Sequence, residues 1–328
     1  MKRRPRESLS RKALKLLCTL MGLTLVCLLG VTVLFQQILQ QTHYVEPAFA
    51  VSEGSLSLAS IVKAENTPEQ RKIGGAGSPL INILLVGQDR REGEDSARSD
   101  SMILCSFHRE TKKLTTTSFL RDIYVEIPGH SSNRINAAYA LGGTALLNRT
   151  LEHNFGLHID GSVEVDFSQF ADIVNLLGGV ELELRKDEAE VINQELGTNL
   201  TEGLQTLTGE EALAYSRIRK LDPDGDFSRT DRQRKVISAL LKMYKHTPIP
   251  DLLPAMSQLM PMITTDMNPG QILMCAMELL PNLEQMELVS QRIPAEGTYQ
   301  DATIDGMSVL TIDLNASRQL LQDTLVGK

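Results

Sequence analysis

The chain has 328 residues and a formal net charge of −8, and its charges are unevenly distributed. Seven of the 33 basic residues lie in residues 1–15 against a single acid, so the remainder of the chain carries about −14. That balance excludes a domain that holds nucleic acid or anionic lipid by general electrostatic attraction. We therefore expect no nucleic-acid partner, and any anion site must be a local cluster of arginines.

A basic tail and an apolar run begin the chain. Leu16–Phe35 is twenty residues without a charge, which as a helix spans roughly 30 Å, the thickness of one bilayer core. The pattern predicts a cytoplasmic tail at 1–15, a transmembrane signal anchor at 16–36 and an extracellular remainder, in a single-pass protein of the cell membrane. The alternative is a cleaved signal peptide, because Ala48-Phe49-Ala50 resembles a cleavage site. That site lies about fifteen residues beyond the apolar run, which favours the uncleaved anchor.

Residues 37–79 are predicted to be a linker, since they end in Gly74-Gly-Ala-Gly77-Ser-Pro79. Residues 80–328 then alternate strand-like and helix-like segments without another break in composition, which is typical of one large α/β domain. We expect a mixed central sheet with helices on both faces, an α-β-α arrangement. Strands are predicted at 80–86, 101–107, 114–120, 123–127 and 180–184, and helices at 136–140, 144–155, 167–177 and 208–216. Cys105 and Cys275, the cysteines of this domain, have apolar neighbours and are expected to be buried thiols.

The segment 226–236, DFSRTDRQRKV, reads as the start of a further helix with an unusual first turn. Ser228 and Asp231 resemble a capping box, and helical spacing places Arg229, Arg232 and Gln233 on the same stripe as the apolar Val236. Arg234 is expected nearer the solvated side. Buried arginines at the positive end of a helix dipole are costly unless an anion shares the site. A phosphate-bearing ligand would satisfy them; the alternative is pairing with local carboxylates such as Asp222, Asp224 and Asp226.

Charged residues also gather at the ends of the predicted strands. Asp89 and Arg90 follow the first strand, Arg98 and Asp100 precede the second, and Arg121 and Asp122 follow the third. Ligand sites of open α/β sheets form at strand ends, so these clusters predict one shared site. Two carboxylates flanking one loop suit Mg²⁺, which takes few protein ligands. Arginines spread over several phosphate oxygens suit a pyrophosphate; the arginines available are Arg121, Arg217, Arg219 and Arg229, with Arg217 and Arg219 pointing to one side if Arg217-Ile-Arg219 is extended.

No side-chain nucleophile stands out. The sequence has no Gly-x-x-x-x-Gly-Lys loop, no Gly-x-Ser-x-Gly elbow and no histidine spacing typical of metal sites. The predicted reaction is therefore direct attack of an acceptor hydroxyl on phosphorus, with catalysis by positioning and charge stabilisation.

At these residues the chain resembles the LytR-CpsA-Psr family of bacterial cell-wall proteins. The motifs that carry the resemblance run in order over about 150 residues, with a motif core at about 80–243. They are Leu84-Leu-Val-Gly-Gln-Asp-Arg90, Arg98-Ser-Asp-Ser101, Phe119-Leu-Arg-Asp122, Arg134-Ile-Asn-Ala-Ala-Tyr139, Val165-Asp-Phe167, Leu177-Gly-Gly-Val180, Leu207-Thr-Gly209, Ala212-Leu-Ala-Tyr-Ser-Arg-Ile-Arg219 and Asp226–Gln233.

The resemblance implies an α-β-α domain with an apolar tunnel for a polyprenyl tail. It implies Mg²⁺-dependent transfer of a glycopolymer phosphate from a polyprenyl-pyrophosphate carrier to a peptidoglycan hydroxyl. The residues expected to be catalytic are Arg121, Asp122, Arg217 and Arg219; those expected to bind pyrophosphate are Arg90, Arg98, Arg134, Arg229 and Gln233; those expected to hold the metal are Asp89 and Asp100.

The chain departs from the family pattern at two motif positions. Arg134 stands where the family usually has Lys, and Leu120 where a Pro is usual; neither change removes a charge. Two other functions remain open: a hydrolase that cleaves lipid pyrophosphates at the same site, and a non-catalytic regulator or polymer-binding protein. The seven methionines between Met256 and Met286 could line an acyl pocket, although core packing is the commoner role.

Overall fold

The structure is a computed structural model that describes residues 43–44, 72–89 and 98–327. The predicted membrane anchor and most of the predicted linker lie outside these residues. Within them, no helix combines the length and the apolar character needed to cross a bilayer.

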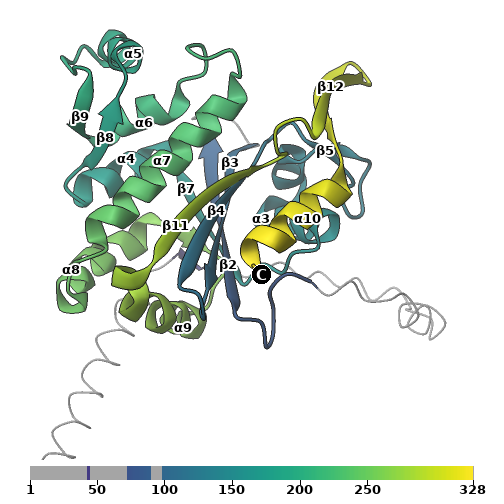
Figure 1. Cartoon of the computed structure of the whole chain (residues 1–328), viewed down its shortest axis with the longest axis horizontal. Helices are drawn as coiled ribbons and strands as arrows, with labels where there is room; N and C mark the ends of the chain where they lie inside the picture. Colours follow the sequence, from purple (N-terminus) through teal and green to yellow (C-terminus); the bar gives the residue numbers. More distant parts are fainter. Residues whose placement is uncertain (1–42, 45–71, 90–97, 328) are drawn as a thin grey trace, which may run out of the picture.

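A seven-stranded mixed sheet forms the centre of the domain (Figure 1). The strand β2 pairs antiparallel with β3 and parallel with β7, so it lies in the middle of the sheet. Its apolar sequence, LINILLV, suits a strand that is covered on both faces. The order across the sheet is β1 (His43–Tyr44), β10 (Thr264–Thr265), β7 (Gly161–Asp166), β2 (Leu80–Asp89), β3 (Arg98–His108), β4 (Lys113–Phe119) and β11 (Glu287–Ile293).

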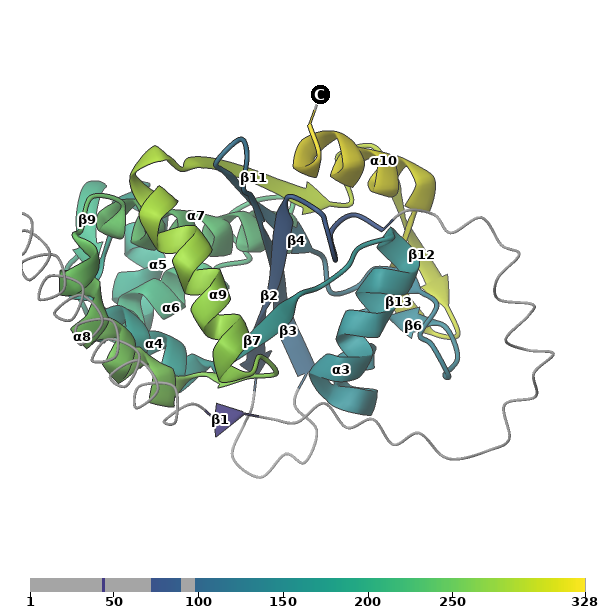
Figure 2. The same cartoon turned by 90° about the horizontal axis from the view of Figure 1, so that it is seen from below.

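Helices cover both faces of this sheet, which confirms the predicted α-β-α arrangement (Figure 2). On one face lie α3 (Asn136–Phe155) and α10 (Leu314–Leu325). On the other lie α4 (Phe167–Leu176), α6 (Gly209–Arg217), α7 (Asp226–Tyr244) and α9 (Pro269–Leu279).

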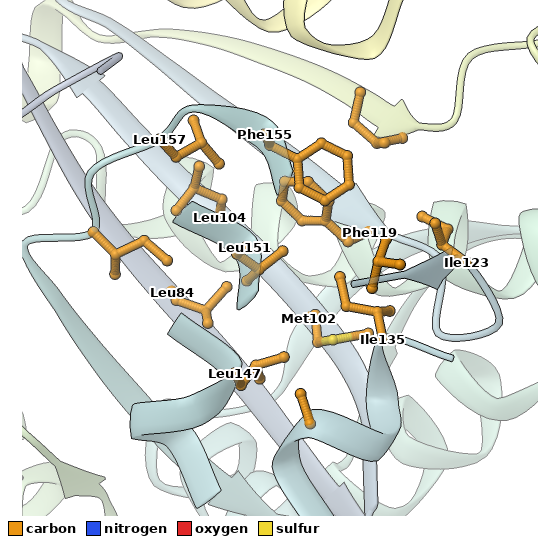
Figure 3. Packing of buried hydrophobic residues seen from close by; sticks show 14 of the residues in the cluster. Leu84, Met102, Leu104, Phe119, Ile123, Ile135, Leu147, Leu151, Phe155 and Leu157 are labelled. Atoms are coloured by element: carbon orange, nitrogen blue, oxygen red, sulfur yellow. The ribbon is translucent and has the colours of Figure 1, made fainter. Parts of the chain in front are cut away.

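The larger core fills the space between the sheet and α3 (Figure 3). Leu84 and Leu104 from adjacent strands meet Leu151 of the helix, and all three are fully buried. The rings of Phe119 and Phe155 pack with their centroids 4.9 Å apart. The helix is interrupted by non-helical backbone at Gly142 and Gly143, as expected for two helices around a Gly-Gly step.

Three strand pairs stand outside the main sheet. The predicted strand at 123–127 is reduced to β5 (Tyr124–Val125), which pairs with β6 (Asn133–Arg134) because the Pro128-Gly129 turn reverses the chain. The other two pairs are β8 (Val180–Leu184) with β9 (Gly203–Leu207), beside α5 (Lys186–Leu196), and β12 (Tyr299–Ile304) with β13 (Met307–Ile312). The remaining elements are α8 (Ile249–Leu259), η1 (Met260–Met262) and η2 (Leu280–Gln285).

The helix α7 begins at Asp226, with Gly225 as its N-cap residue and no capping hydrogen bond from a side chain. The predicted capping box at Ser228 and Asp231 is therefore wrong. Asp231 instead pairs with residues three and four positions further along the helix, Arg234 at 3.1 Å and Lys235 at 3.3 Å.

Candidate active site

A cavity of about 320 Å³ lies at the ends of β3 and β4. Its lining combines four guanidinium groups with a single carboxylate. The lining residues are Asp100 and Ser101 from β3, Arg121 after β4, Phe167 from α4, Ser216, Arg217 and Arg219 from the end of α6, and Arg229 and Gln233 from α7. The structure thus brings together the predicted residues of four separate motifs.

Two aspartates hold the guanidinium groups in place. Asp100 accepts a hydrogen bond from Arg121 Nη1 at 2.8 Å and lies 3.7 Å from Arg219 Nη2. Asp226 accepts from Arg229 Nη2 at 2.9 Å. The same Asp226 carboxylate lies 3.8 Å from Arg121 Nε and 3.7 Å from Arg219 Nε. These contacts preorganise the arginines before any ligand binds.

The cations outnumber the carboxylates that face them. Burial lowers the pKa of Arg229, and Asp226 only partly offsets this effect. Burial also acts to lower the pKa of Arg121, but Asp226 and Asp100 outweigh it and the net shift is upward. The Nε atoms of both arginines are buried without a hydrogen-bond partner among the described residues. An anion in the cavity would offset the electrostatic cost of burying Arg229.

The helix α6 delivers two arginines to the cavity. Thr208 and Glu211 form a capping box at its start. Arg217 is the last helical residue rather than part of an extended segment, so that expectation is wrong in detail. Its consequence holds, because buried Ile218 turns into the core while Arg217 and Arg219 both line the cavity.

Phe167 and Gln233 are fixed by neighbours at the cavity wall. The Arg217 guanidinium lies over the Phe167 ring, 5.0 Å from its centroid, a cation–π contact. Ser101 Oγ donates to Gln233 Oε1 at 3.0 Å, which leaves the Gln233 amide nitrogen as the donor for a ligand.

An apolar cavity of about 460 Å³ adjoins the charged one. The two share Ser101, Phe167, Ser216 and Gln233 in their linings. The apolar cavity extends between the sheet and the helices, and its other lining residues include Ile103, Val163, Phe170, Ile173, Leu213, Val236, Ile237, Leu240, Leu259 and Ile263. A ligand that fills both cavities has an anionic head and a long apolar tail.

Gly209 sets the distance between two walls of this apolar cavity. A Cβ atom at this position would lie 2.0 Å from the carbonyl oxygen of Ala171, on α4. Only glycine therefore lets α6 approach α4 this closely.

Some predicted site residues lie beside the cavity or outside the description. Arg134 contacts Asp122 at 3.2 Å, and Asp122 lies 3.6 Å from Arg121, so both lie behind the lining rather than in it. Asp89 and Arg98 face each other as paired backbone positions where β2 and β3 begin to separate, and their side chains lie outside the description. Arg90 lies outside the described residues.

The arginines of α7 divide between two roles. Arg229 lines the charged cavity, but Arg232 pairs with the buried Glu188 at 2.9 Å and with Asp222, and also donates to Ile218 O. The alternative of pairing with local carboxylates is thus confirmed for Arg232, which pairs with Asp222, and also for Arg229, which pairs with Asp226 while lining the cavity.

Arg234 is buried, so the prediction that it lies nearer the solvated side is wrong. Its Nε donates to Ser290 Oγ on β11 at 2.7 Å and its Nη2 to Asp231 at 3.1 Å. The reason is that α7 packs against β8 on one side and β4 and β11 on others, leaving little of it in solvent.

Three residues that contribute to the site were not predicted as site residues from the sequence. Asp226 was considered only as a local partner, although it bridges three arginines. Ser101 and Phe167 lie within the quoted motifs, which was the available signal. Nothing in the local pattern shows that they separate the charged cavity from the apolar one.

Of the two predicted metal ligands, Asp89 and Asp100, only Asp100 has a described side chain. Asp100 presents a carboxylate to the charged cavity, and Mg²⁺ commonly takes one or two carboxylates together with phosphate oxygens. Among the described residues, no group of three or more His, Cys, Asp or Glu side chains is arranged to hold a metal ion. Any such ion would therefore depend on ligand oxygens as well as on Asp100.

The chain is an α/β protein in which a charged cavity adjoins an apolar one, an arrangement that would suit an anionic amphiphile. The chain belongs to the LytR_cpsA_psr family, whose model matches residues 51–324. This confirms the resemblance seen in the motifs.

Relatives of this chain carry two kinds of name. Over 250 residues it is 33% identical to the "Regulatory protein MsrR" of Staphylococcus aureus, covering 75% of this chain and 74% of that protein. Over 166 residues it is 40% identical to the "Polyisoprenyl-teichoic acid--peptidoglycan teichoic acid transferase TagU" of Bacillus anthracis, covering 50% of this chain and 53% of TagU.

A solved structure of the family protein YwtF (TagT) "with bound octaprenyl pyrophosphate lipid" is similar to this one. Its TM-score is 0.60 at 28% identity, over 79% of this chain and 96% of that one. With transferases among the relatives, family membership confirms the prediction of an enzyme of the glycopolymer transferase type.

Proposed function

We propose that this chain is a membrane-anchored phosphotransferase that moves a glycopolymer phosphate from a polyprenyl-pyrophosphate carrier to a peptidoglycan hydroxyl. The observation that carries the proposal is the continuity of the charged and apolar cavities through Ser101, Phe167, Ser216 and Gln233. Relatives point the same way, since TagU is named as a teichoic acid transferase and a TagT structure holds a prenyl pyrophosphate.

The arginines supply binding and charge stabilisation. The acceptor oxygen attacks the phosphorus that carries the glycopolymer, a new P–O bond forms, and the bond to the bridging oxygen breaks. The polyprenyl phosphate departs, and the acceptor proton leaves with it. Charge grows on the phosphate oxygens during this step, where Arg121, Arg219 and Arg229 converge. Preorganised donors of this kind commonly account for about 10²–10³ in rate each.

Mg²⁺ is proposed as the cofactor, held by Asp100 together with Asp89. It would neutralise part of the charge on the pyrophosphate when bound. Asp100 already balances Arg121 and Arg219, so its carboxylate links the cation site to the phosphate-binding arginines.

The membrane anchor is proposed from the twenty uncharged residues at Leu16–Phe35 and the basic tail before them. It would keep the catalytic domain outside the cell and close to lipid-linked donors.

The decisive experiment uses the full chain in detergent or vesicles, a lipid-linked polymer labelled in its glycan, isolated peptidoglycan, and Mg²⁺ or EDTA. We expect label to become covalently attached to peptidoglycan in Mg²⁺ and not in EDTA. Label released only as free glycopolymer phosphate would show a hydrolase. Transfer that continues in EDTA would contradict the cofactor while leaving the transferase in place.

A further inference from the structure

The segment from Leu252 to Met277 is a neutral stretch on the surface of a charged protein. Its 26 residues contain one charged residue, Asp266, whereas 23% of the whole chain is charged. The Asp266 carboxylate accepts hydrogen bonds from the Ser162 backbone N–H and from Asn148 Nδ2, so each of its oxygens has a partner within the fold. Asp266 is partly buried, and no other residue of the stretch is charged.

Large apolar side chains project from this stretch. Met274 and Met277, one turn apart on α9, are 64% and 67% exposed. Their neighbours on the inner face of α9, among them Ile272 and Cys275, pack on the sheet, so the methionines face outward. Single exposed apolar residues are common on soluble proteins, but a pair of them one turn apart is characteristic of a contact surface, and Glu278, the one charged residue of α9, is paired with Arg109.

The same stretch pairs with a strand that follows closely after the predicted membrane span. His43 and Tyr44 form β1, which pairs in parallel with Thr264 and Thr265 of β10, in the middle of the neutral stretch (Figure 2). Only seven residues separate Phe35, the end of the predicted span, from His43. A fully extended chain of that length reaches about 29 Å at most. With the proposed anchor in the bilayer, this edge of the domain lies next to the membrane surface.

The apolar cavity reaches the same region. Leu259 of α8 and Ile263 after η1 line it, at residues of the neutral stretch. Gln233 and Ser101 line its junction with the charged cavity. A prenyl tail could therefore pass from the lipid phase into the protein alongside this segment.

We propose that the surface of α8, η1 and α9 rests on the membrane, with Met274 and Met277 inserted into the outer leaflet. The inference rests on the membrane anchor in the proposed function. The charged residues of these three elements are the acids Asp251 and Glu278, with no Lys or Arg among them, so apolar contact and not attraction to anionic headgroups holds the surface there.

The absence of tryptophan from the whole chain makes a direct test possible. Met274→Trp, Met277→Trp and the control Leu204→Trp each give the full chain one unique fluorophore. Leu204 is 68% exposed and lies on β9, at the opposite end of the domain from α9 in Figure 1. Each variant is reconstituted in phosphatidylcholine vesicles, with or without bromine on the acyl chains, and checked for unchanged thermal unfolding.

We expect brominated lipid to quench the indole of Met274→Trp and of Met277→Trp at least about threefold more than that of Leu204→Trp, with no effect of salt on the difference. Equal quenching in the three variants would overturn the inference while leaving the anchor intact, provided that the protein floats with the vesicles. The emission of Met277→Trp could instead be blue-shifted, unquenched by brominated lipid and dependent on protein concentration. That result would contradict the inference and assign the surface to a second copy of the chain. Protein that does not float with the vesicles would instead contradict the membrane anchor, and with it the inference.

Discussion

The Asp226 carboxylate lies 2.9 Å from Arg229 Nη2, while Arg229 Nε is buried without a hydrogen-bond partner among the described residues. The guanidinium is thus held on one side and unsatisfied on the other. One carboxylate fixes its orientation without filling its hydrogen-bonding capacity. Arg229 also lines the charged cavity, where one more anion would balance its charge.

Replacing Arg229 should affect ligand binding more than folding. Arg229→Ala should lower transfer by about 10²–10³, and Arg229→Lys should recover part of the loss because it restores the charge without the planar fork. Transfer rates and affinity for a short prenyl pyrophosphate, measured beside thermal unfolding, check this. If Arg229→Ala mainly lowered the melting temperature and left turnover per folded molecule unchanged, the role would be structural.

Arg232 should behave in the opposite way. Arg232→Ala removes the nearer of the two cations beside the buried Glu188 and one of the two cations beside Asp222, leaving Arg185 at both. Removing one partner of a buried ion pair costs roughly 3–5 kcal/mol. Urea unfolding should show the loss directly. Transfer per folded molecule should stay within severalfold of the parent, because Arg232 does not line the charged cavity. A loss of turnover as large as that of Arg229→Ala, at unchanged stability, would contradict this division of roles.

The helical spacing of α7 was informative about burial but not about partners. It correctly placed Arg229 and Arg232 on a buried stripe. What separates their functions is Glu188, which comes from α5, 44 positions away in the sequence. The same holds for Arg234, since the Ser290 that satisfies it lies on β11. Local periodicity cannot report contacts that only tertiary packing creates.

The fold itself was more accessible, because long apolar strands and Gly-Gly breaks are local signals. The main strands β2, β3 and β4 and the helix α4 lie where they were predicted, within a few residues. The strand pairing in which β11 joins β4 was not predicted, since it connects segments about 170 residues apart. The site residues were predicted from the motifs and their order along the chain. The boundary between the two cavities could be seen only in the structure.

Arg234→Ala should destabilise the protein without changing the chemistry. The substitution removes the hydrogen bonds that the buried guanidinium donates to Ser290 Oγ and Asp231, and such a hydrogen bond typically contributes about 0.5–1.5 kcal/mol net. Lys235→Ala, at the neighbouring position on the helix, is the matched control and should be close to neutral. Thermal unfolding of the two variants side by side decides, and equal melting temperatures would show that the Arg234 contacts add nothing.

Filling the apolar cavity should discriminate between lipids by tail length. Ile237 lines this cavity on α7, and Ile237→Trp should weaken binding of long-chain polyprenyl pyrophosphates while sparing a one- or two-unit prenyl pyrophosphate. Lys235→Trp places the same ring on the exposed side of the same helix and should change neither affinity. Equal weakening for short and long tails would place the tail elsewhere.

Acid should weaken the contacts of Asp222. Hydrogen bonds from Arg185 and Arg232 lower the pKa of Asp222 below its ordinary value. They outweigh the burial of Asp222, which acts to raise it. The stabilisation is therefore present above the unfolded-state pKa of about 4 and is lost as the pH falls through the lower folded-state value. Asp222→Asn should be less stable than the parent at pH 7, and the difference should shrink towards pH 3. Urea unfolding at several pH values measures it; a constant difference would exclude a role for this titration.

The sharing of Ser101 and Gln233 by the two cavities has a kinetic consequence for the proposed reaction. Cleavage of the pyrophosphate changes only the head of the carrier, so the spent polyprenyl phosphate keeps every contact that its tail had before. Departure of the product must then undo the full apolar interaction, and this step rather than bond cleavage would limit turnover. A rapid first turnover followed by a slower steady state, with the steady rate rising as the tail is shortened, is the pattern that this architecture imposes.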